Sequence, residues 1–254
     1  MHPIFSKYLF FIFLFCAPVF CIAQGAKAPV VVVTVKTQHV IAKLGDSLKN
    51  QFEKQNLTWP PQGLYIRSFK YDRELEVWVQ AKAGEAYKLF KSYKVCMQSG
   101  STGPKRMEGD YQVPEGFYYI NEFNPNSNYH LSLGLNYPNG ADKILSDVHR
   151  PGSAIYIHGN CVSTGCIPIK DDGIEELYML ASYAKASGQE FIPVHVFPIK
   201  YNVKKSVEYL ETAIKENQYL QQFNKNIKEV FNYFETNKKL PLIMVNKNGE
   251  YVIN

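Results

Sequence analysis

The sequence predicts a β-rich α+β protein whose strands lie in the middle of the chain and whose helices flank them. Between residues 62 and 199, short stretches alternate apolar and polar side chains, which is typical of strands. On either side, apolar residues recur every three or four positions, which is typical of amphipathic helices. The 254 residues, 46% of them hydrophobic, suffice for one globular domain with an extension. The net charge of +5 includes no long basic block, so nucleic-acid binding is not indicated.

Residues 1–23 are predicted to be a signal peptide. A lysine precedes an apolar run over residues 8–20, and the following Cys-Ile-Ala resembles a small-x-small cleavage site, so Gln24 would begin the mature chain. The run is short for a membrane span, and we expect export across the inner membrane to the periplasm. A lipoprotein is the alternative because Cys16 and Cys21 are available, although neither follows the usual Leu-small-small pattern.

Residues 24–61 are expected to form an N-terminal extension. The apolar, β-branched run over residues 29–35 predicts a short strand or an extended arm. Helical spacing of apolar residues over 38–55 predicts a helix. The Trp-Pro-Pro run at residues 59–61 would end that helix and form a rigid connector.

Residues 62–199 are expected to form the main domain. The alternating pattern predicts strands over residues 65–70, 75–79, 87–97, 129–139, 154–157 and 191–198. Residues 103–118 predict a loop that turns into a further strand, and residues 141–148 predict a short helical link. A longer helix is expected after residue 170, with Asp171 or Asp172 as its N-cap.

Residues 200–254 are expected to form a C-terminal helical extension that ends in a hairpin. Apolar residues recur at three and four over residues 203–234, which predicts one broken helix or two consecutive helices. Residues 242–245 and 251–253 flank a Lys-Asn-Gly turn, so we expect these two stretches to pair as a terminal hairpin.

One segment, residues 155–170, concentrates the side chains that can carry chemistry. His158 ends an apolar run, and Cys166 follows after Gly, Asn, Ser and Thr residues that suit tight turns. A helical pattern begins shortly after Cys166, and the positive end of a helix dipole would favour its thiolate. A nearby imidazole would supply the base that a weak nucleophile needs. The pattern therefore predicts an activated cysteine with a histidine partner.

This segment resembles the signature of the L,D-transpeptidase (YkuD-type) family, which joins a His-Gly at a strand end to Ser-x-Gly-Cys. Here the matching residues are His158-Gly159 and Ser163-Thr164-Gly165-Cys166, and the short gap between them is similar to the YafK-type branch. The GPK, GD and PEGFY groups within residues 103–118 also resemble the family. The resemblance covers about residues 62–199. It implies a β-sandwich-type catalytic domain that opens with an antiparallel sheet, and the extensions could form walls over its cleft.

The resemblance implies cysteine acyl transfer on peptidoglycan stem peptides, with no cofactor and no metal. Cys166 would attack a stem-peptide carbonyl and form a thioester, with His158 as base and then acid. In the family a backbone carbonyl next to the His orients its ring, and here that carbonyl belongs to Gly159. The oxyanion hole would come from the backbone N–H groups of Gly165 and Cys166, with Thr164 as a further donor.

Two positions depart from the commoner form of the motif. Thr164 stands where a second His is usual, and Pro168 stands where an Arg linked to substrate contact is usual. Lys170 or Arg150 could take over recognition of a substrate carboxylate. The remaining candidates for the substrate groove are Ser163, Tyr137 and His130. A structural histidine is the alternative for His130.

Other functions are compatible with parts of this pattern. Because the motif does not separate an amine acceptor from water, an L,D-carboxypeptidase or amidase that hydrolyses stem-peptide or protein–peptidoglycan bonds is the main alternative. A wall-attached protein would then be a partner. A non-catalytic wall-binding protein would lack the Cys/His pair. Zinc ligation by His158, Cys161 and Cys166 matches no common spacing and lacks a fourth ligand. His195 is expected to be a core histidine, with a supporting role beside the site as the alternative.

The cysteines left after removal of residues 1–23 are Cys96, Cys161 and Cys166. Because three is odd, at least one thiol stays free in an oxidising compartment, which suits a catalytic Cys166. Cys96 and Cys161 could be buried thiols or could pair with each other, and their spacing does not decide between these. A Cys161–Cys166 disulfide would instead block catalysis and act as a redox switch.

Overall fold

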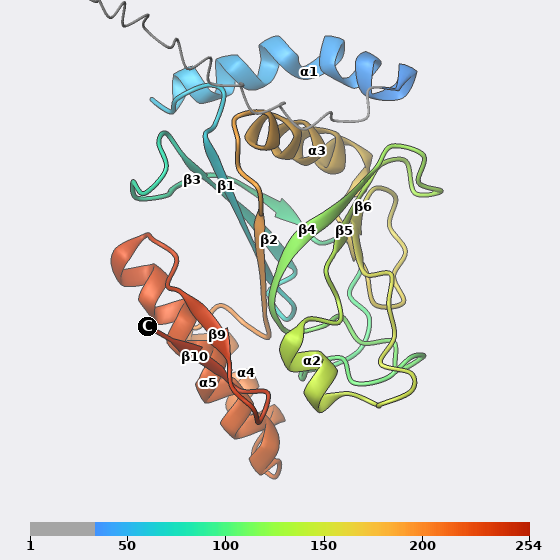
Figure 1. Ribbon diagram of the computed structural model, residues 1–254, viewed down its shortest axis with the longest axis vertical. Helices are drawn as coiled ribbons and strands as arrows, with labels where there is room; N and C mark the ends of the chain where they lie inside the picture. The colour runs from blue at the N-terminus through green and yellow to red at the C-terminus, as the bar shows by residue number, and fades with distance from the viewer. Residues whose placement is uncertain (1–33) are drawn as a thin grey trace, which may run out of the picture.

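The chain folds around one curled, mixed sheet of eight strands, flanked by helices (Figure 1). The computed structural model describes residues 34–254. In chain order the strands are β1 (Gly63–Phe69), β2 (Glu74–Gln80), β3 (Lys88–Lys94), β4 (Gly116–Asn124), β5 (Ser132–Leu135), β6 (Tyr156–His158), β7 (Ile167–Pro168) and β8 (Pro193–Phe197). The helices are α1 (Val35–Lys54), α2 (Gly140–Leu145), α3 (Lys170–Ala186), α4 (Lys204–Ala213) and α5 (Gln218–Asn237). A separate hairpin joins β9 (Ile243–Val245) to β10 (Tyr251–Ile253).

The strands lie side by side in the order β3-β2-β1-β8-β4-β5-β6-β7. Pairing is antiparallel except between β1 and β8 and between β6 and β7, which are parallel. β8 therefore joins the β1–β3 meander to β4–β6 across the middle of the sheet. The predicted β-rich α+β class is confirmed, and every strand of this sheet lies within the predicted main domain, residues 62–199.

Helices cover both faces of the sheet, which explains why every residue of β1 is buried (Figure 1). Leu64 and Ile66 point to one face and join the core cluster that contains Phe52 of α1. The alternate residue Tyr65 points to the other face, where its ring lies 4.8 Å from that of Phe234 in α5. Successive strand residues face opposite sides, so every residue of β1 can be buried only because both sides are covered.

The extensions therefore cover the two faces of the sheet. This differs from the prediction based on the family resemblance, in which they form walls over a cleft. α1 packs on α3 at one face, and α5 with the β9–β10 hairpin lies at the other (Figure 1). Beneath α5, Arg67 makes ion pairs of 2.6 Å with both Glu76 and Glu235. Burial of these charges is tolerable because each is paired.

The N-terminal helix begins three residues earlier than its apolar spacing predicted. Thr34 caps α1, since its side chain accepts a hydrogen bond from the Thr37 backbone N–H at 3.2 Å, in a capping box. The predicted strand or arm over residues 29–35 is wrong at Val35, where α1 begins, whereas the backbone of Thr34 is extended; residues 29–33 lie outside the described part of the chain. The predicted signal peptide also lies outside it. α1 ends at Lys54, before the Trp-Pro-Pro run that we expected to end it.

Three further predicted elements differ from the structure in their bounds. The strand predicted over residues 129–139 is paired only from Ser132 to Leu135, and the helical link over 141–148 begins at Gly140 and ends at Leu145. The strand predicted over 87–97 is β3, Lys88–Lys94. The predicted end of each of these three elements lies three or four residues beyond the observed end, and the two strands were also predicted to start too early.

The C-terminal prediction of two helices and a hairpin is confirmed. α4 ends at Ala213, and Asn217 caps α5 by accepting a hydrogen bond from the Leu220 backbone N–H at 3.0 Å. β9 and β10 pair antiparallel around the Lys-Asn-Gly turn. Within residues 34–254 no helix combines the length and the apolar character needed to cross a membrane.

Candidate active site

The two candidate catalytic residues lie on neighbouring strands at one edge of the sheet. His158 is the last residue of β6, and Cys166 directly precedes β7. The two strands are parallel, with Ile157 opposite Ile167 and His158 opposite Pro168. The loop from Gly159 to Cys166 therefore returns the chain to the strand that carries the histidine.

His158 is held as a neutral base. Its ring is buried, and Nδ1 lies 2.5 Å from the carbonyl oxygen of Gly159. With the Nδ1–H donated to that carbonyl, Nε2 keeps its lone pair and can accept a proton. Burial lowers the pKa of His158, and the Gly159 carbonyl partly opposes this. The predicted orienting role of Gly159 therefore has the geometry that it needs.

Gly159 is also required for close packing around the histidine. A Cβ at this position would lie 2.6 Å from the carbonyl oxygen of Tyr129 and 2.5 Å from a carboxylate oxygen of Asp171. The Tyr129 ring packs against the His158 ring, with 4.6 Å between centroids. Only a residue without a side chain lets the chain turn there while the ring keeps this contact.

Cys166 is the free thiol of the described residues and is half-buried. Burial raises the pKa of this thiol, and the backbone N–H of Tyr156 partly opposes the increase. The thiol donates to the carbonyl oxygen of Ala154 over 3.7 Å, as a protonated group does. Burial therefore favours the protonated form of the Cys166 thiol and the neutral form of the His158 imidazole.

The predicted helix start directly after Cys166 is wrong, and with it the reason given for a thiolate. β7 lies between Cys166 and α3, which begins only at Lys170, so the thiol is outside the first turn where the dipole acts. The predicted N-caps are wrong as well, because Ile169 occupies the cap position without a side-chain bond. The Asp171 carboxylate instead accepts the Asn160 backbone N–H at 2.7 Å and anchors the catalytic loop.

Ser163 shapes the loop just before the nucleophile. Its hydroxyl donates to the Cys166 carbonyl oxygen at 2.7 Å and accepts the Gly165 N–H at 3.2 Å. The Gly165 N–H, which we predicted as an oxyanion donor, is thus engaged within the loop in this conformation. Gly165 has φ of +136°, and a Cβ there would lie 3.0 Å from the Gln112 carbonyl oxygen. Glycine is needed here for both reasons.

A disulfide between Cys96 and Cys161 ties the loop to the chain that follows β3. The neighbouring contacts reinforce it, since Cys96 N–H donates to the Pro168 carbonyl at 3.0 Å and Ser99 bonds Ser163 at 2.9 Å. Of the alternatives left open by the spacing, the Cys96–Cys161 pair is confirmed. Cys161 is therefore unavailable for a bond to Cys166 or as a zinc ligand. No group of three or more metal-ligating side chains occurs in residues 34–254.

An open hollow of about 410 Å³ lies beside Cys166. Two loops form its walls together with the catalytic loop, and its lining residues are Lys105, Glu108, Gly109, Tyr111, Gly152, Ser153, Ala154, Ile155, Thr164, Gly165 and Cys166. The predicted floor, residues 103–118, thus supplies one wall. Lys105, Glu108 and Tyr111 were not among the predicted site residues. The GPK and GD groups were the only sequence signal that pointed to this loop.

The other predicted substrate residues lie away from this hollow. The Tyr137 side chain is buried, and its hydroxyl donates to the Pro151 carbonyl at 2.7 Å. His130 bonds Glu175 at 2.8 Å, which agrees with its structural alternative. Arg150 and Lys170 are exposed, and neither lines the hollow. Tyr137 therefore supports the wall from behind, and His130 braces the chain before β5 against α3.

His195 lies on the sheet face that α5 covers. Its Nδ1 is 2.8 Å from the hydroxyl of Tyr65, and its ring packs 4.6 Å from that of Phe117. Burial, with a smaller contribution from the Arg67 charge, lowers the pKa of His195 to about 3. These contacts are those of a core histidine, which was the expected role.

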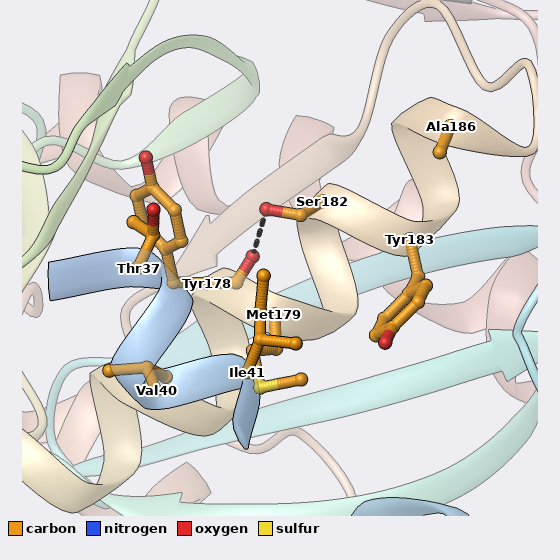
Figure 2. A pocket seen from close by; sticks show the side chains of 8 residues that line it. All are labelled: Thr37, Val40, Ile41, Tyr178, Met179, Ser182, Tyr183 and Ala186. Carbon is orange, nitrogen blue, oxygen red and sulfur yellow. Dashed lines mark hydrogen bonds between the residues drawn. The ribbon is translucent and has the colours of Figure 1, made fainter. Parts of the chain in front are cut away.

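A second hollow, of about 180 Å³, lies between α1 and α3 (Figure 2). Its lining is mostly apolar and includes Val40 and Ile41 from α1 and Met179 from α3. The dashed line in Figure 2 marks a Ser182 hydroxyl donating to the Tyr178 carbonyl at 2.7 Å within α3. No cysteine, histidine or charged side chain lines this hollow, so it is not a candidate for the chemistry at Cys166.

The fold, with Cys166 and His158 at one edge of its sheet, is that of a known class of protein. The family model of the L,D-transpeptidase catalytic domain (YkuD) matches residues 75–196. This chain belongs to that family. The predicted family is confirmed, and the matched range includes both His158 and Cys166.

Among individual relatives, the chain is similar to the Escherichia coli (strain K12) protein named "Putative L,D-transpeptidase YafK". The two are 34% identical over 205 residues, which cover 79% of this chain and 77% of the relative. The protein of the same name from Escherichia coli O157:H7 matches equally. A crystal structure of the helical cell shape determining protein Pgp2 from Campylobacter jejuni is 20% identical, with a TM-score of 0.42 over 72% of this chain and 73% of that one.

Proposed function

We propose that the protein is a cysteine acyltransferase that acts on peptidoglycan stem peptides through a thioester at Cys166. The observation that carries the proposal is a free thiol that opens onto a hollow, next to a strand pair that ends in a buried histidine whose ring bonds the Gly159 carbonyl. Family membership supports the same substrate class, because L,D-transpeptidases act on peptidoglycan. Because the site is half-buried, hydrogen bonds to the charge that develops in the transition state are stronger than they would be in water.

The reaction begins from a neutral pair. As the Cys166 sulfur bonds to the stem-peptide carbonyl carbon, His158 Nε2 takes the thiol proton. The carbonyl oxygen becomes an oxyanion, for which the backbone N–H groups at Cys166 and Thr164 are the proposed donors, and Gly165 joins them if Ser163 releases it. Losing one such donor costs about 3 kcal/mol in the transition state. The C–N bond then breaks, and His158 protonates the leaving amine.

The thioester passes its acyl group to an amine, which forms a cross-link, or to water, which trims or releases a stem peptide. We also propose that the reaction takes place in the periplasm. The Cys96–Cys161 disulfide supports an oxidising compartment, since such bonds are rare in the cytosol.

Purified protein incubated with muropeptides, followed by intact-mass analysis and product chromatography, tests the proposal. The wild type is expected to form an acyl adduct and cross-linked muropeptides, and Cys166→Ala is expected to form neither while keeping its fold. Shortened or released stems without cross-links would assign the hydrolase. Turnover retained in Cys166→Ala would refute the nucleophile. Binding of muropeptides without any adduct or product would favour a non-catalytic wall-binding protein.

A further inference from the structure

Every cysteine of residues 34–254 lies at the edge of the sheet that carries the candidate active site. Cys161 and Cys166 belong to the same loop, which runs from Gly159 to Cys166 and joins β6 to β7. Cys96 comes from the chain after β3, and its Cα lies 5.8 Å from that of Cys161 in the disulfide. The Cys96 N–H donates to the carbonyl of Pro168, in β7, at 3.0 Å. The three sulfur atoms thus gather around one loop, and of these only that of Cys166 is free.

Without the disulfide, Cys161 would have Cys166 as its near neighbour along the chain. Only residues 162–165 separate the two. They form a turn, since the Ser163 hydroxyl donates to the Cys166 carbonyl at 2.7 Å and accepts the Gly165 N–H at 3.2 Å. A disulfide requires Cα atoms about 4.4–6.8 Å apart, a separation that a turn of this length allows. Closing so short a loop also costs less chain entropy than closing the native bond, whose partners are 65 residues apart.

The chain around Cys96 is held in place by contacts that do not involve its sulfur. The Arg73 guanidinium donates to the carbonyls of Val95, at 3.3 Å, and of Cys96, and the Val95 N–H donates to the Arg73 carbonyl at 2.8 Å. The fold itself therefore presents Cys96 to Cys161, which offsets the longer loop. Burial also raises the pKa of the Cys166 thiol, so it is less readily converted to the thiolate that would attack the neighbouring disulfide.

We infer that the Cys96–Cys161 disulfide guards the nucleophile, because it occupies the cysteine that would otherwise bond to Cys166 and block it. Without this bond, a disulfide oxidant R–S–S–R accepts two electrons from the pair. The S–H bonds of Cys161 and Cys166 break, one S–S bond forms between them, and two R–SH molecules leave with the protons. A dithiol reverses the reaction. The consequence for catalysis rests on the proposed function, whereas the pairing of the sulfur atoms does not.

Alkylation in a mildly oxidising glutathione buffer tests which sulfur atoms pair. Wild type, Cys96→Ser and the matched control Cys161→Ser are equilibrated, alkylated with N-ethylmaleimide, and analysed by intact mass and peptide mapping. Cys96→Ser is expected to lose both alkylatable thiols and to yield a Cys161–Cys166 peptide. Cys161→Ser, which removes the other half of the same bond, is expected to keep an alkylatable Cys166, as the wild type does. Dithiothreitol is expected to restore both thiols of Cys96→Ser.

A Cys96→Ser variant whose Cys166 is alkylated as in the wild type would overturn the inference. So would a Cys96–Cys166 bond in Cys161→Ser, because any leftover thiol would then reach the nucleophile. The double variant Cys96→Ser/Cys161→Ser can form neither bond, and it is expected to stay folded by circular dichroism with Cys166 alkylatable. Loss of its fold would count against the guard role, because the disulfide would then serve the stability of the domain.

Turnover of muropeptides connects the pairing to the proposed reaction. In the oxidising buffer Cys96→Ser is expected to lose turnover, and dithiothreitol is expected to restore it to the level of the double variant. Turnover by Cys96→Ser that the oxidising buffer leaves unchanged would contradict the guard role. If the wild type turns over no muropeptide in either buffer, the proposed function fails, and the count of alkylated thiols still decides whether Cys96 keeps Cys161 from Cys166.

Discussion

Replacing Lys70 with Met is expected to destabilise the protein strongly and to loosen the wall of the Cys166 hollow. Lys70 follows β1, and its side chain is only 4% exposed. Its ammonium lies 3.1 Å from the Glu115 carboxylate and donates to the carbonyls of Gly103 at 2.8 Å and Val113 at 2.9 Å. One buried cation thus gathers both ends of the loop that carries Lys105.

The magnitude follows from the charge that the substitution leaves behind. Burial lowers the pKa of Lys70, and the nearby Glu115 carboxylate opposes that effect, so each charge of the pair depends on the other. Without Lys70, Glu115 is an uncompensated carboxylate in the core, and breaking such a pair costs about 3–5 kcal/mol. Lys70→Met/Glu115→Gln removes both charges while the amide oxygen can still accept the Gly103 N–H. The double variant is therefore expected to recover about 2 kcal/mol relative to Lys70→Met.

The free energy of unfolding is measured by urea titration, followed by the fluorescence of Trp59 and Trp78, together with the alkylation rate of Cys166. Lys70→Met should lower the free energy of unfolding. It should also change the alkylation rate of Cys166, because the Gln112 carbonyl of this loop packs against Gly165. A loss below about 1 kcal/mol would refute the reasoning, because it falls under the range for a broken buried pair. A double variant less stable than Lys70→Met would refute it as well.

Two pH dependences follow from burial. Because burial raises the pKa of Cys166, its alkylation by a neutral reagent should keep rising above pH 8.5, the ordinary region for a thiol, and a plateau below pH 7 would instead indicate a thiolate–imidazolium pair. The pKa of His195 is lowered to about 3 in the folded protein, whereas its ordinary value is about 6.5. Between these pH values only the unfolded chain binds a proton at this residue, so the folded protein loses stability as the pH falls from 6.5 towards 3. The wild type should lose about 2 kcal/mol more than His195→Gln between pH 6.5 and 4.5, measured by urea titration at both values, and equal losses would contradict the assignment.

The sequence by itself determined the parts of this protein that depend on neighbouring residues. The His158-Gly159 and Ser163 to Cys166 groups predicted that a thiol and an imidazole lie at the two ends of one short loop, and the structure has them on and beside the paired strands β6 and β7. Helical spacing predicted α4 and α5, and the turn between two apolar runs predicted the β9–β10 hairpin. Glycine at position 165 reflects a left-handed backbone, which a sequence records directly, whereas Gly159 is needed because Tyr129 and Asp171 approach it.

Only the tertiary structure decided what distant parts of the chain contribute. Cys96 meets Cys161 because β3 ends beside the catalytic loop, and spacing along the chain cannot encode that approach. Burial also raises the pKa of the Cys166 thiol, whereas the local sequence suggested a helix dipole that would lower it. His130 faces Glu175 of α3 for the same reason. Burial, charge compensation and hydrogen-bond partners depend on which segments pack together, so they emerge only once the sheet has closed around them.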